Sequence, residues 1–290
     1  MRIAQLAGRE ETPALEERLA KLDPSAPSDY REIAALLASE WSLDPPTFVG
    51  LSGGQGAGKS TLSRLIAAAC EDAGLRTCVL SLDDFYYPLS ARRRLASEIH
   101  PLLETRGPPG THDLIECRDA MRALRQDEAV LLPVFDKGLD DRKMKRLVRG
   151  PFDLVLLEGW CVGAVPESES GLDPAMNSLE EEEDQDGVWR RYVNAQLAGI
   201  YGEVGQMLDY LIFLRVPDLV AVRRWRLEQE MERTPKQRHD REAIDRFVQY
   251  FERTTRSMDQ TVPGRADLVV GLSSDHSVFG VTFVSTPKTT

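Results

Sequence analysis

The chain has 290 residues, of which 42% are hydrophobic and 29% are charged, the proportions of an ordinary soluble globular protein. Its 36 lysines and arginines and 47 aspartates and glutamates give a formal net charge of −11. This charge argues against general binding to nucleic acid or to an anionic membrane, so any anionic ligand must be held by a local basic site.

Cysteine usage and apolar run lengths predict a cytoplasmic protein that is not embedded in a membrane. No cysteine belongs to a CxxC pair and each falls in an apolar segment, which favours buried free thiols over disulfides: Cys70, Cys78, Cys117 and Cys161. The N-terminal residues lack the apolar core of a signal peptide. No run approaches the roughly 18 apolar residues of a membrane helix.

Residues 1–46 are expected to form a helical N-terminal extension with polar and proline-rich connections. Segments 12–22 and 28–41 have helical spacing. In the second segment the apolar residues recur at intervals of three and four: Ile33, Leu36, Leu37 and Trp41. The sequence SLDPP (42–46) then breaks the pattern, and we expect residues 47–290 to form one further domain.

From residue 47 onward, apolar strand patterns alternate with helical patterns. We expect strands at 47–52, 76–82, 129–135 and 152–159. A helix should begin near Lys59 and end before Gly74, which stands at the C′ position. A second helix should begin after Asp113, a good N-cap residue.

The rest of the chain contains an acidic segment and further α/β alternation. Like charges in SLEEEEDQDG (178–187) disfavour compact packing, so we expect residues 167–187 to be a solvated, mobile insertion. Helices are then expected at 188–207, 219–234 and 243–254, and strands at 210–216 and 265–272, with a break at 235–240. The strands are apolar throughout, which predicts an α/β fold with a mainly parallel sheet flanked by helices.

The segment GGQGAGKST matches the P-loop pattern GxxxxGK[ST] and lies between an apolar strand and an amphipathic helix. Its glycines let backbone N–H groups turn toward phosphate oxygens, and the helix dipole adds to the attraction. Lys59 is expected to reach the β- and γ-phosphates of ATP, and Ser60 to ligate Mg²⁺. The predicted nucleotide-binding residues are Gly53, Gly54, Gln55, Gly56, Ala57, Gly58, Lys59, Ser60 and Thr61.

Two strand ends supply candidate carboxylates beside this loop. Asp83 follows the strand at 76–82 and could accept a proton from a hydroxyl that attacks the γ-phosphate. The alternative is that Asp83 and Asp84 only cap the next turn. Glu158 ends the apolar strand at 152–159 in the manner of a Walker B residue, so it is a second candidate Mg²⁺ ligand. The guanine-reading NKxD element of GTPases is absent from the sequence.

Basic residues between the strands are candidates for binding a small anionic acceptor: Arg106, His112, Lys137 and Arg142. Arg224 and Arg226, on the arginine-rich helix at 219–234, could close over the phosphates as a lid. Solvated loop charges and ordinary i,i+4 helix pairs are the alternatives, for example Arg224 with Glu228.

The order of these elements resembles the P-loop kinases of small metabolites, such as uridine kinase, phosphoribulokinase and pantothenate kinase. Asp83 and Phe85 match their Asp-x-Phe element. Within the group the chain is most similar to the plant-type D-glycerate 3-kinases and their microbial relatives. The matching segments are SLDDFY, RGPPGTHD, the loop from Lys137 to Arg142, LEGWCVG, VNAQLAGIY and RWRLEQE.

This resemblance implies that residues 47–290 form a P-loop kinase domain with a helical arginine-rich lid. It implies transfer of the γ-phosphoryl group of ATP to D-glycerate, with Asp83 as the base and Arg226 over the phosphates. The loop between Lys137 and Arg142 is shorter than in the plant enzymes, and this loop borders the acceptor. Pantothenate, a nucleoside or a sugar as acceptor, or a nucleotide-binding regulatory role, are the alternatives.

Overall fold

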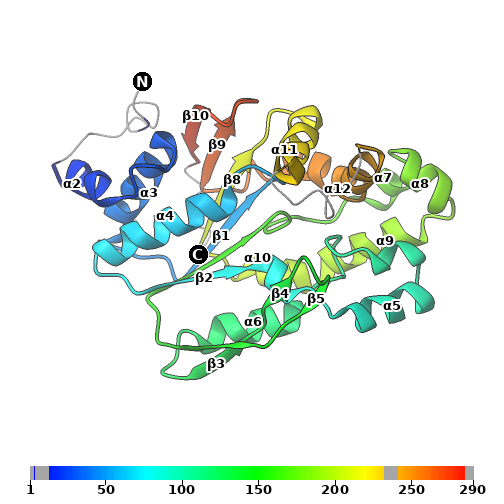
Figure 1. Cartoon of the computed structure of the whole chain (residues 1–290), viewed down its shortest axis with the longest axis horizontal. Coiled ribbons are helices and arrows are strands. Elements are labelled where there is room, and N and C mark those ends of the chain that lie inside the picture. Colours follow the sequence, from blue (N-terminus) through cyan, green and yellow to red (C-terminus); the bar gives the residue numbers. More distant parts are fainter. Residues whose placement is uncertain (1–2, 4–12, 232–240, 285–290) are drawn as a thin grey trace.

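A six-stranded sheet forms the centre of the computed structural model (Figure 1). The structure describes residue 3, residues 13–231 and residues 241–284. The strand order is β10-β9-β8-β1-β7-β2. In chain order the strands are β1 (Phe48–Gly53), β2 (Thr77–Ser81), β7 (Leu154–Gly159), β8 (Tyr210–Arg215), β9 (Leu268–Leu272) and β10 (Val278–Phe283).

Five of these strands are parallel, and only the edge strand β10 runs antiparallel to its neighbour β9. Both faces of the sheet are covered. In β7, Leu154 and Leu156 join the apolar core on one face, while Val155 and Leu157 join the core on the other. This two-sided burial explains why the strand sequences are mostly apolar instead of alternating between apolar and polar residues.

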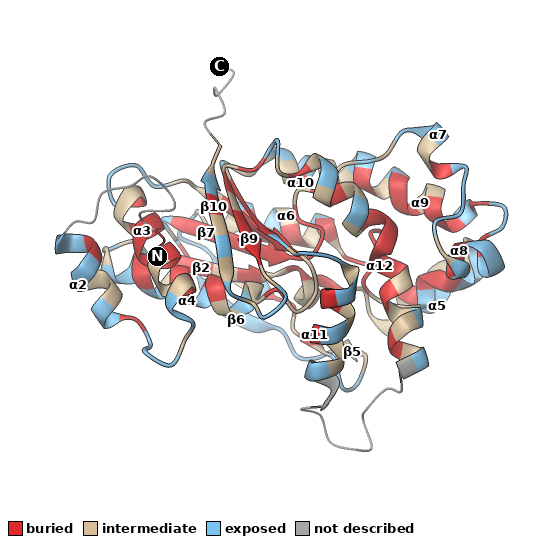
Figure 2. Cartoon of the chain, turned by 90° about the horizontal axis from the view of Figure 1, so that it is seen from above, coloured by how far each residue is buried: buried red, intermediate tan, exposed pale blue. Residues whose placement is uncertain are grey.

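Helices cover the two faces as two separate layers (Figure 2). One layer contains α2 (Pro13–Lys21), α3 (Ser28–Trp41), α4 (Lys59–Asp72) and α11 (Leu219–Met231). The other contains α6 (Leu114–Ala123), α9 (Val188–Gln196), the π-helical turn η3 (Leu197–Tyr201), α10 (Gly202–Gln206) and α12 (Arg241–Thr261). The N-terminal helix α3 packs on α4 and shares its apolar core with β1 and β8.

Smaller elements lie outside the central sheet. They are η1 (Leu82–Phe85), α5 (Leu89–Glu98), η2 (Pro101–Glu104), β3 (Ala129–Leu132), β4 (Phe135–Asp136), β5 (Asp141–Arg142), β6 (Arg146–Arg149), α7 (Glu169–Leu172) and α8 (Ser178–Glu183). No helix within the described residues is long and apolar enough to cross a lipid bilayer.

The predicted α/β class and most predicted elements are confirmed. Strands β1, β2, β7, β8 and β9 begin and end within three residues of the expected ranges. The four cysteines are buried free thiols. Gly74 follows α4 with a left-handed φ of 86°, as the C′ position requires. Asp113 caps α6 by accepting a hydrogen bond from the Glu116 amide. The break expected at 235–240 and the end of the preceding helix, 232–234, lie outside the described residues.

The prediction of a single sheet strand at 129–135 is wrong. Residues 129–132 form β3, which pairs only with β6 in a peripheral antiparallel ribbon, and Phe135 begins the short pair of β4 with β5. Pro133 separates the two, since proline lacks the N–H that a continuous ladder would need. Leu131 remains 57% exposed, so this apolar run is not buried on both faces.

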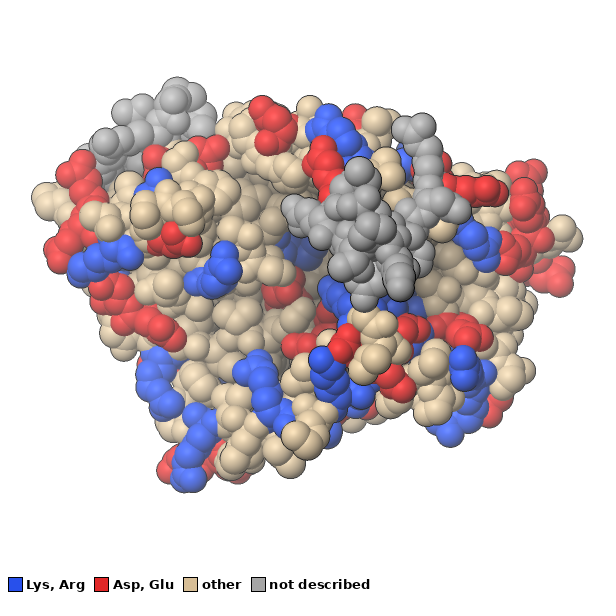
Figure 3. All heavy atoms as spheres, viewed as in Figure 1, with Lys and Arg blue, Asp and Glu red and all other residues tan. Residues whose placement is uncertain are grey.

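The prediction that residues 167–187 form a solvated insertion is also corrected. The segment folds into α7 and α8, and the Glu180 carboxylate is fully buried. Arg253 of α12 donates to both Glu180 oxygens, at 2.7 and 2.6 Å, which compensates the buried charge. The other glutamates of α8 remain on the surface, where acidic side chains gather at the right-hand edge of Figure 3.

Candidate active site

The P-loop connects β1 to the first turn of α4 and requires glycine at two positions. Gly56 and Gly58 have left-handed φ values of 78° and 82°. A Cβ atom at Gly56 would lie 2.7 Å from Trp225, and one at Gly58 would lie 2.8 Å from the Tyr30 ring. The loop is therefore enclosed by α11 on one side and α3 on the other. The Lys59 ammonium group donates to the carbonyls of Gly53 and Gly54, both at 3.0 Å.

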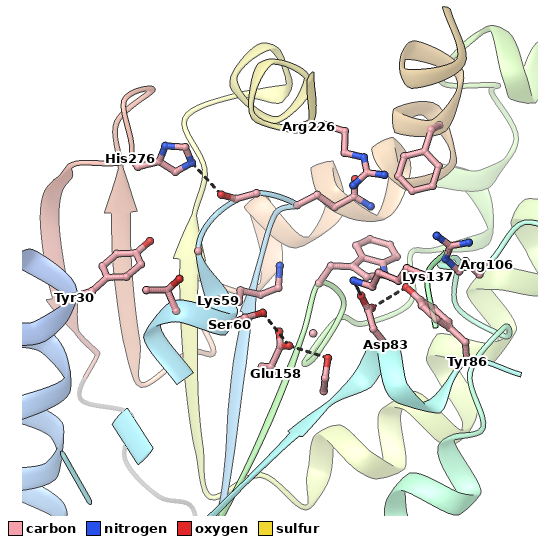
Figure 4. A pocket seen from close by; sticks show the side chains of 18 of the residues that line it. Tyr30, Lys59, Ser60, Asp83, Tyr86, Arg106, Lys137, Glu158, Arg226 and His276 are labelled. Carbon is pink, nitrogen blue, oxygen red and sulfur yellow. Dashed lines mark hydrogen bonds and ion pairs between the residues drawn. The ribbon is translucent and has the colours of Figure 1, made fainter. Parts of the chain in front are cut away.

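A pocket of about 550 Å³ opens around this loop (Figure 4). Lys59, Ser60 and Glu158 lie in its middle. Tyr30 and His276 lie toward one end, and Asp83, Tyr86, Lys137 and Arg106 toward the other. The volume is in the range of small-molecule sites, and the parallel strands place it at their carboxyl ends, where such folds bind ligands.

A hydroxyl and a carboxylate meet at the centre of the pocket. Ser60 Oγ and Glu158 Oε1 are 3.3 Å apart, and Ser81 Oγ donates to the same carboxylate oxygen at 2.8 Å. Ser81 and Glu158 face each other because β2 and β7 pair in that register. Oxygen ligands of this kind suit Mg²⁺, which binds through one or two protein groups, phosphates and water. The two residues predicted to hold the metal are thus adjacent.

Asp83 lies at the end of β2 with its carboxylate in the pocket. Lys137 Nζ lies 2.6 Å from Oδ2, and the Tyr86 hydroxyl donates to Oδ1 at 2.7 Å. Burial raises the pKa of Asp83, but the charge of Lys137 and the two hydrogen bonds outweigh burial and lower it to about 2. Asp83 is thus ionised at neutral pH. Its neighbour Asp84 instead accepts a hydrogen bond from the Phe135 amide of β4 at 3.1 Å.

The charges at the centre of the pocket compensate one another. Burial lowers the pKa of Lys59, and the carboxylates of Glu158 and Asp83 act in the opposite direction. The positive side chains at the Asp83 end of the pocket come from two separate loops. Lys137 is 55% exposed, and Arg106 forms an ion pair with Asp140 of the Lys137 loop.

Two of the four predicted acceptor-binding residues lie outside the pocket wall. The Arg142 guanidinium is held by the Glu116 carboxylate at 2.8 Å and by the carbonyls of Phe85 and Tyr86. His112 is buried behind the Tyr86 ring, with the ring centroids 4.5 Å apart. Burial lowers the pKa of His112 to about 3, so its imidazole is neutral and adds no positive charge. Both residues support the site from outside.

Of the two predicted lid arginines, one lines the pocket and the other does not. Arg226 lines the pocket, with its guanidinium 5.0 Å from the centroid of the Phe247 ring on α12. Arg224 does not line it. Its side chain is 49% exposed and lies 3.5 Å from Glu228, the i,i+4 pair that was the alternative interpretation. The part of α11 that faces the pocket is therefore the turn around Arg226.

Several pocket residues are missing from the sequence-based predictions. Ser81 and Tyr86 orient the two carboxylates, and Trp160 donates from its indole N–H to the Gly107 carbonyl at 3.0 Å. Ser81 could have been predicted, because it ends a strand beside Glu158. Tyr30 and His276 come from segments far from the P-loop in sequence, so no local pattern indicates them.

The pocket thus combines a phosphate-binding loop, a pair of oxygen ligands suited to Mg²⁺, an ionised carboxylate and four cationic side chains, Lys59 of the loop among them. Phosphoryl transfer depends mainly on positioning and on stabilising the charge of the moving group. This set of groups has the components that such a reaction needs.

Comparison with known proteins gives related kinases. The "Uncharacterized kinase mug58" of Schizosaccharomyces pombe is 31% identical over 227 residues, which are 71% of this chain and 78% of that protein. The chloroplastic D-glycerate 3-kinase of Arabidopsis thaliana is 28% identical over 203 residues, or 64% of this chain and 41% of that protein. No family model matches the chain.

A solved structure confirms the fold. The D-glycerate 3-kinase of Cryptococcus neoformans superposes with a TM-score of 0.71 at 24% identity, covering 94% of this chain and all of that one. Together with the relatives in sequence and the P-loop at the centre of the pocket, this places the protein in a family. The chain belongs to the P-loop kinases of small metabolites, the group that contains D-glycerate 3-kinase and uridine kinase.

Proposed function

We propose that the protein transfers the γ-phosphoryl group of ATP to the 3-hydroxyl of D-glycerate, giving ADP and 3-phosphoglycerate. The observation that carries this proposal is the Asp83–Lys137 pair, which lies at the end of the pocket beyond Lys59. A carboxylate there can take the proton of an acceptor hydroxyl. A cation beside it can attract an acceptor that bears its own carboxylate.

The pocket residues have three different roles in the proposed reaction. Lys59 and Arg226 stabilise the negative charge of the transferring group. Ser60 and Glu158 would hold Mg²⁺, which supplies charge neutralisation at the phosphate oxygens when it is bound. Asp83 orients the acceptor hydroxyl and takes its proton as the bond to phosphorus forms, while the ADP oxygen leaves with its electron pair.

The acceptor end favours a small carboxylic acid over a nucleoside. Arg106 and Lys137 provide two cations in a chain whose net charge is −11. A nucleoside would need an aromatic face on which its base could stack, but Phe85, Tyr86 and Phe135 are each at least 90% buried. Tyr86 stacks on His112 and meets the edge of Phe135. The similarity to the Arabidopsis D-glycerate 3-kinase supports the same acceptor.

The structure gives little support to the alternative of a nucleotide-binding regulator. The acidic segment at 167–187 could have served a regulator as an exposed tail, but it packs on α12 through the Glu180–Arg253 pair. We therefore retain an enzyme as the proposal, and another small hydroxylated acid as the second candidate acceptor.

An acceptor panel tests the proposal. ADP release from Mg-ATP is measured with D-glycerate, L-glycerate, pantothenate, uridine, ribulose 5-phosphate and no acceptor. We expect turnover with D-glycerate well above that with every other compound. Turnover with another compound would replace the acceptor and keep the mechanism. No acceptor-dependent turnover with any compound would contradict the proposed activity.

A further inference from the structure

Two side chains from outside the P-loop hold its backbone. The Tyr30 hydroxyl of α3 donates to the Ala57 carbonyl at 2.6 Å, and this contact is buried. The His276 ring nitrogen Nε2 lies 3.0 Å from the Gly56 carbonyl. Because a carbonyl oxygen only accepts, Nε2 must carry the proton in this contact. Consecutive peptide groups of the loop are thus fixed by residues 27 and 220 positions away in the chain.

Each anchor is itself held firmly. Tyr30 is 3% exposed and packs against Gly58, and burial raises the pKa of its hydroxyl, which therefore keeps its proton. The His276 ring stacks on Trp225, with the centroids 4.1 Å apart, and the residue has a left-handed φ of 68°. Non-glycine residues in that conformation are uncommon and are often found at functional sites.

The two anchors are also connected to each other. Asp29, next to Tyr30, accepts a hydrogen bond from the Val278 amide at 3.0 Å, two residues after His276. The start of α3 and the turn between β9 and β10 therefore meet beside the P-loop. Figure 4 shows Tyr30 and His276 at the same end of the pocket, opposite Asp83.

A peptide group is planar, and in its trans form the N–H points opposite to the C=O. Fixing the Ala57 carbonyl toward Tyr30 therefore directs the Gly58 N–H away from Tyr30. P-loops bind phosphate through inward-pointing N–H groups. We propose that Tyr30 and His276 are positioning residues that pre-organise the P-loop for the phosphate chain of the nucleotide. The N-terminal helix α3 is then part of the nucleotide site.

Binding measurements without an acceptor test this proposal independently of the assignment to D-glycerate. The dissociation constants of Mg-ATP and of Mg-tripolyphosphate are measured by calorimetry for the wild type and for Tyr30→Phe, which keeps the ring and loses the hydroxyl. Loss of one hydrogen bond should weaken binding about three- to tenfold. Because the anchor acts on the phosphate loop, both ligands should lose affinity by the same factor. His276→Asn, which tolerates the left-handed conformation, should act in the same direction.

Tyr192→Phe is the matched control, since it removes a tyrosine hydroxyl from α9 on the other face of the sheet. It should leave both dissociation constants unchanged. An unchanged affinity in Tyr30→Phe and His276→Asn would overturn the proposal. A loss confined to ATP, with tripolyphosphate unaffected, would also overturn it, because Tyr30 would then act on the nucleoside. An equal loss in Tyr192→Phe would have the same consequence.

Discussion

Single residues decide the charge state of the pocket, and Lys137 is the residue that most lowers the pKa of Asp83, against the opposite effect of burial. Replacing Lys137 with methionine removes the cation and leaves the burial of Asp83, so the pKa of Asp83 should rise from about 2. The acid limb of the pH profile of kcat/KM should therefore move to higher pH. Lys143→Met is the control, since Lys143 pairs with Asp136 instead. An acid limb at the same pH in both variants would argue against the Asp83–Lys137 coupling.

The Asp83–Lys137 pair also makes the free energy of unfolding depend on pH. The folded-state pKa of Asp83 lies below its ordinary value of 3.8. Its contribution to the free energy of unfolding is therefore present above about pH 4 and is lost as the pH falls toward 2.

Glu158 is expected to act through the metal. Glu158→Gln replaces a charged oxygen ligand with a neutral one, so the Mg²⁺ concentration that gives half-maximal rate should rise about tenfold or more. Ser81→Ala removes only the hydrogen bond that orients Glu158, so its shift should be smaller. A Mg²⁺ titration that coincides with the wild type in Glu158→Gln would contradict the metal-binding role.

Site residues that lie next to a sequence motif could be predicted from the sequence. Site residues that come from elements distant in sequence could not. Lys59, Ser60, Asp83 and Glu158 follow strands in order, and parallel strands bring their ends together. Tyr30 and His276 depend on how α3 and the turn before β10 pack, which no short pattern specifies. Arg142 has the same residue type as Arg106, but Glu116 holds it outside the pocket.

At the scale of elements, a buried ion pair between Glu180 and Arg253 is one of the contacts that join α8 to α12. Glu180→Gln leaves the Arg253 guanidinium buried with a weaker partner, so the free energy of unfolding should fall by about 3 kcal/mol. Glu182→Gln changes an exposed side chain of the same helix and should change it by less than about 0.5 kcal/mol. Urea unfolding measures both. Equal stability of the two variants would argue against the ion pair.

Two elements show where sequence patterns fail for physical reasons. The run of glutamates in α8 predicts exposure because like charges repel, but Arg253, more than 70 residues away, compensates one of them. The apolar run at 129–135 predicts a buried strand, but it forms the two-stranded ribbon of β3 with β6. In both cases a partner distant in sequence decides the outcome.

At the scale of the whole molecule, the fold gathers positive side chains into one pocket of a chain whose net charge is negative. The surface is acidic overall, while the pocket collects Lys59, Arg106, Lys137 and Arg226 around the expected phosphate path. The apolar strands and the P-loop were enough to predict the α/β kinase fold. The identity of the acceptor depends on side chains from separate loops. The sequence therefore indicated D-glycerate only through the resemblance to the D-glycerate 3-kinases.

The most direct test of the account compares the initial rates of the wild type, Asp83→Asn and Asp84→Asn with Mg-ATP and D-glycerate, alongside their affinities for ATP. We expect acceptor-dependent formation of 3-phosphoglycerate by the wild type, a loss of about 10²- to 10⁴-fold in kcat for Asp83→Asn with ATP binding retained, and a much smaller loss for Asp84→Asn. A wild type without acceptor-dependent product, or an Asp83→Asn variant near the wild-type rate, would contradict the account.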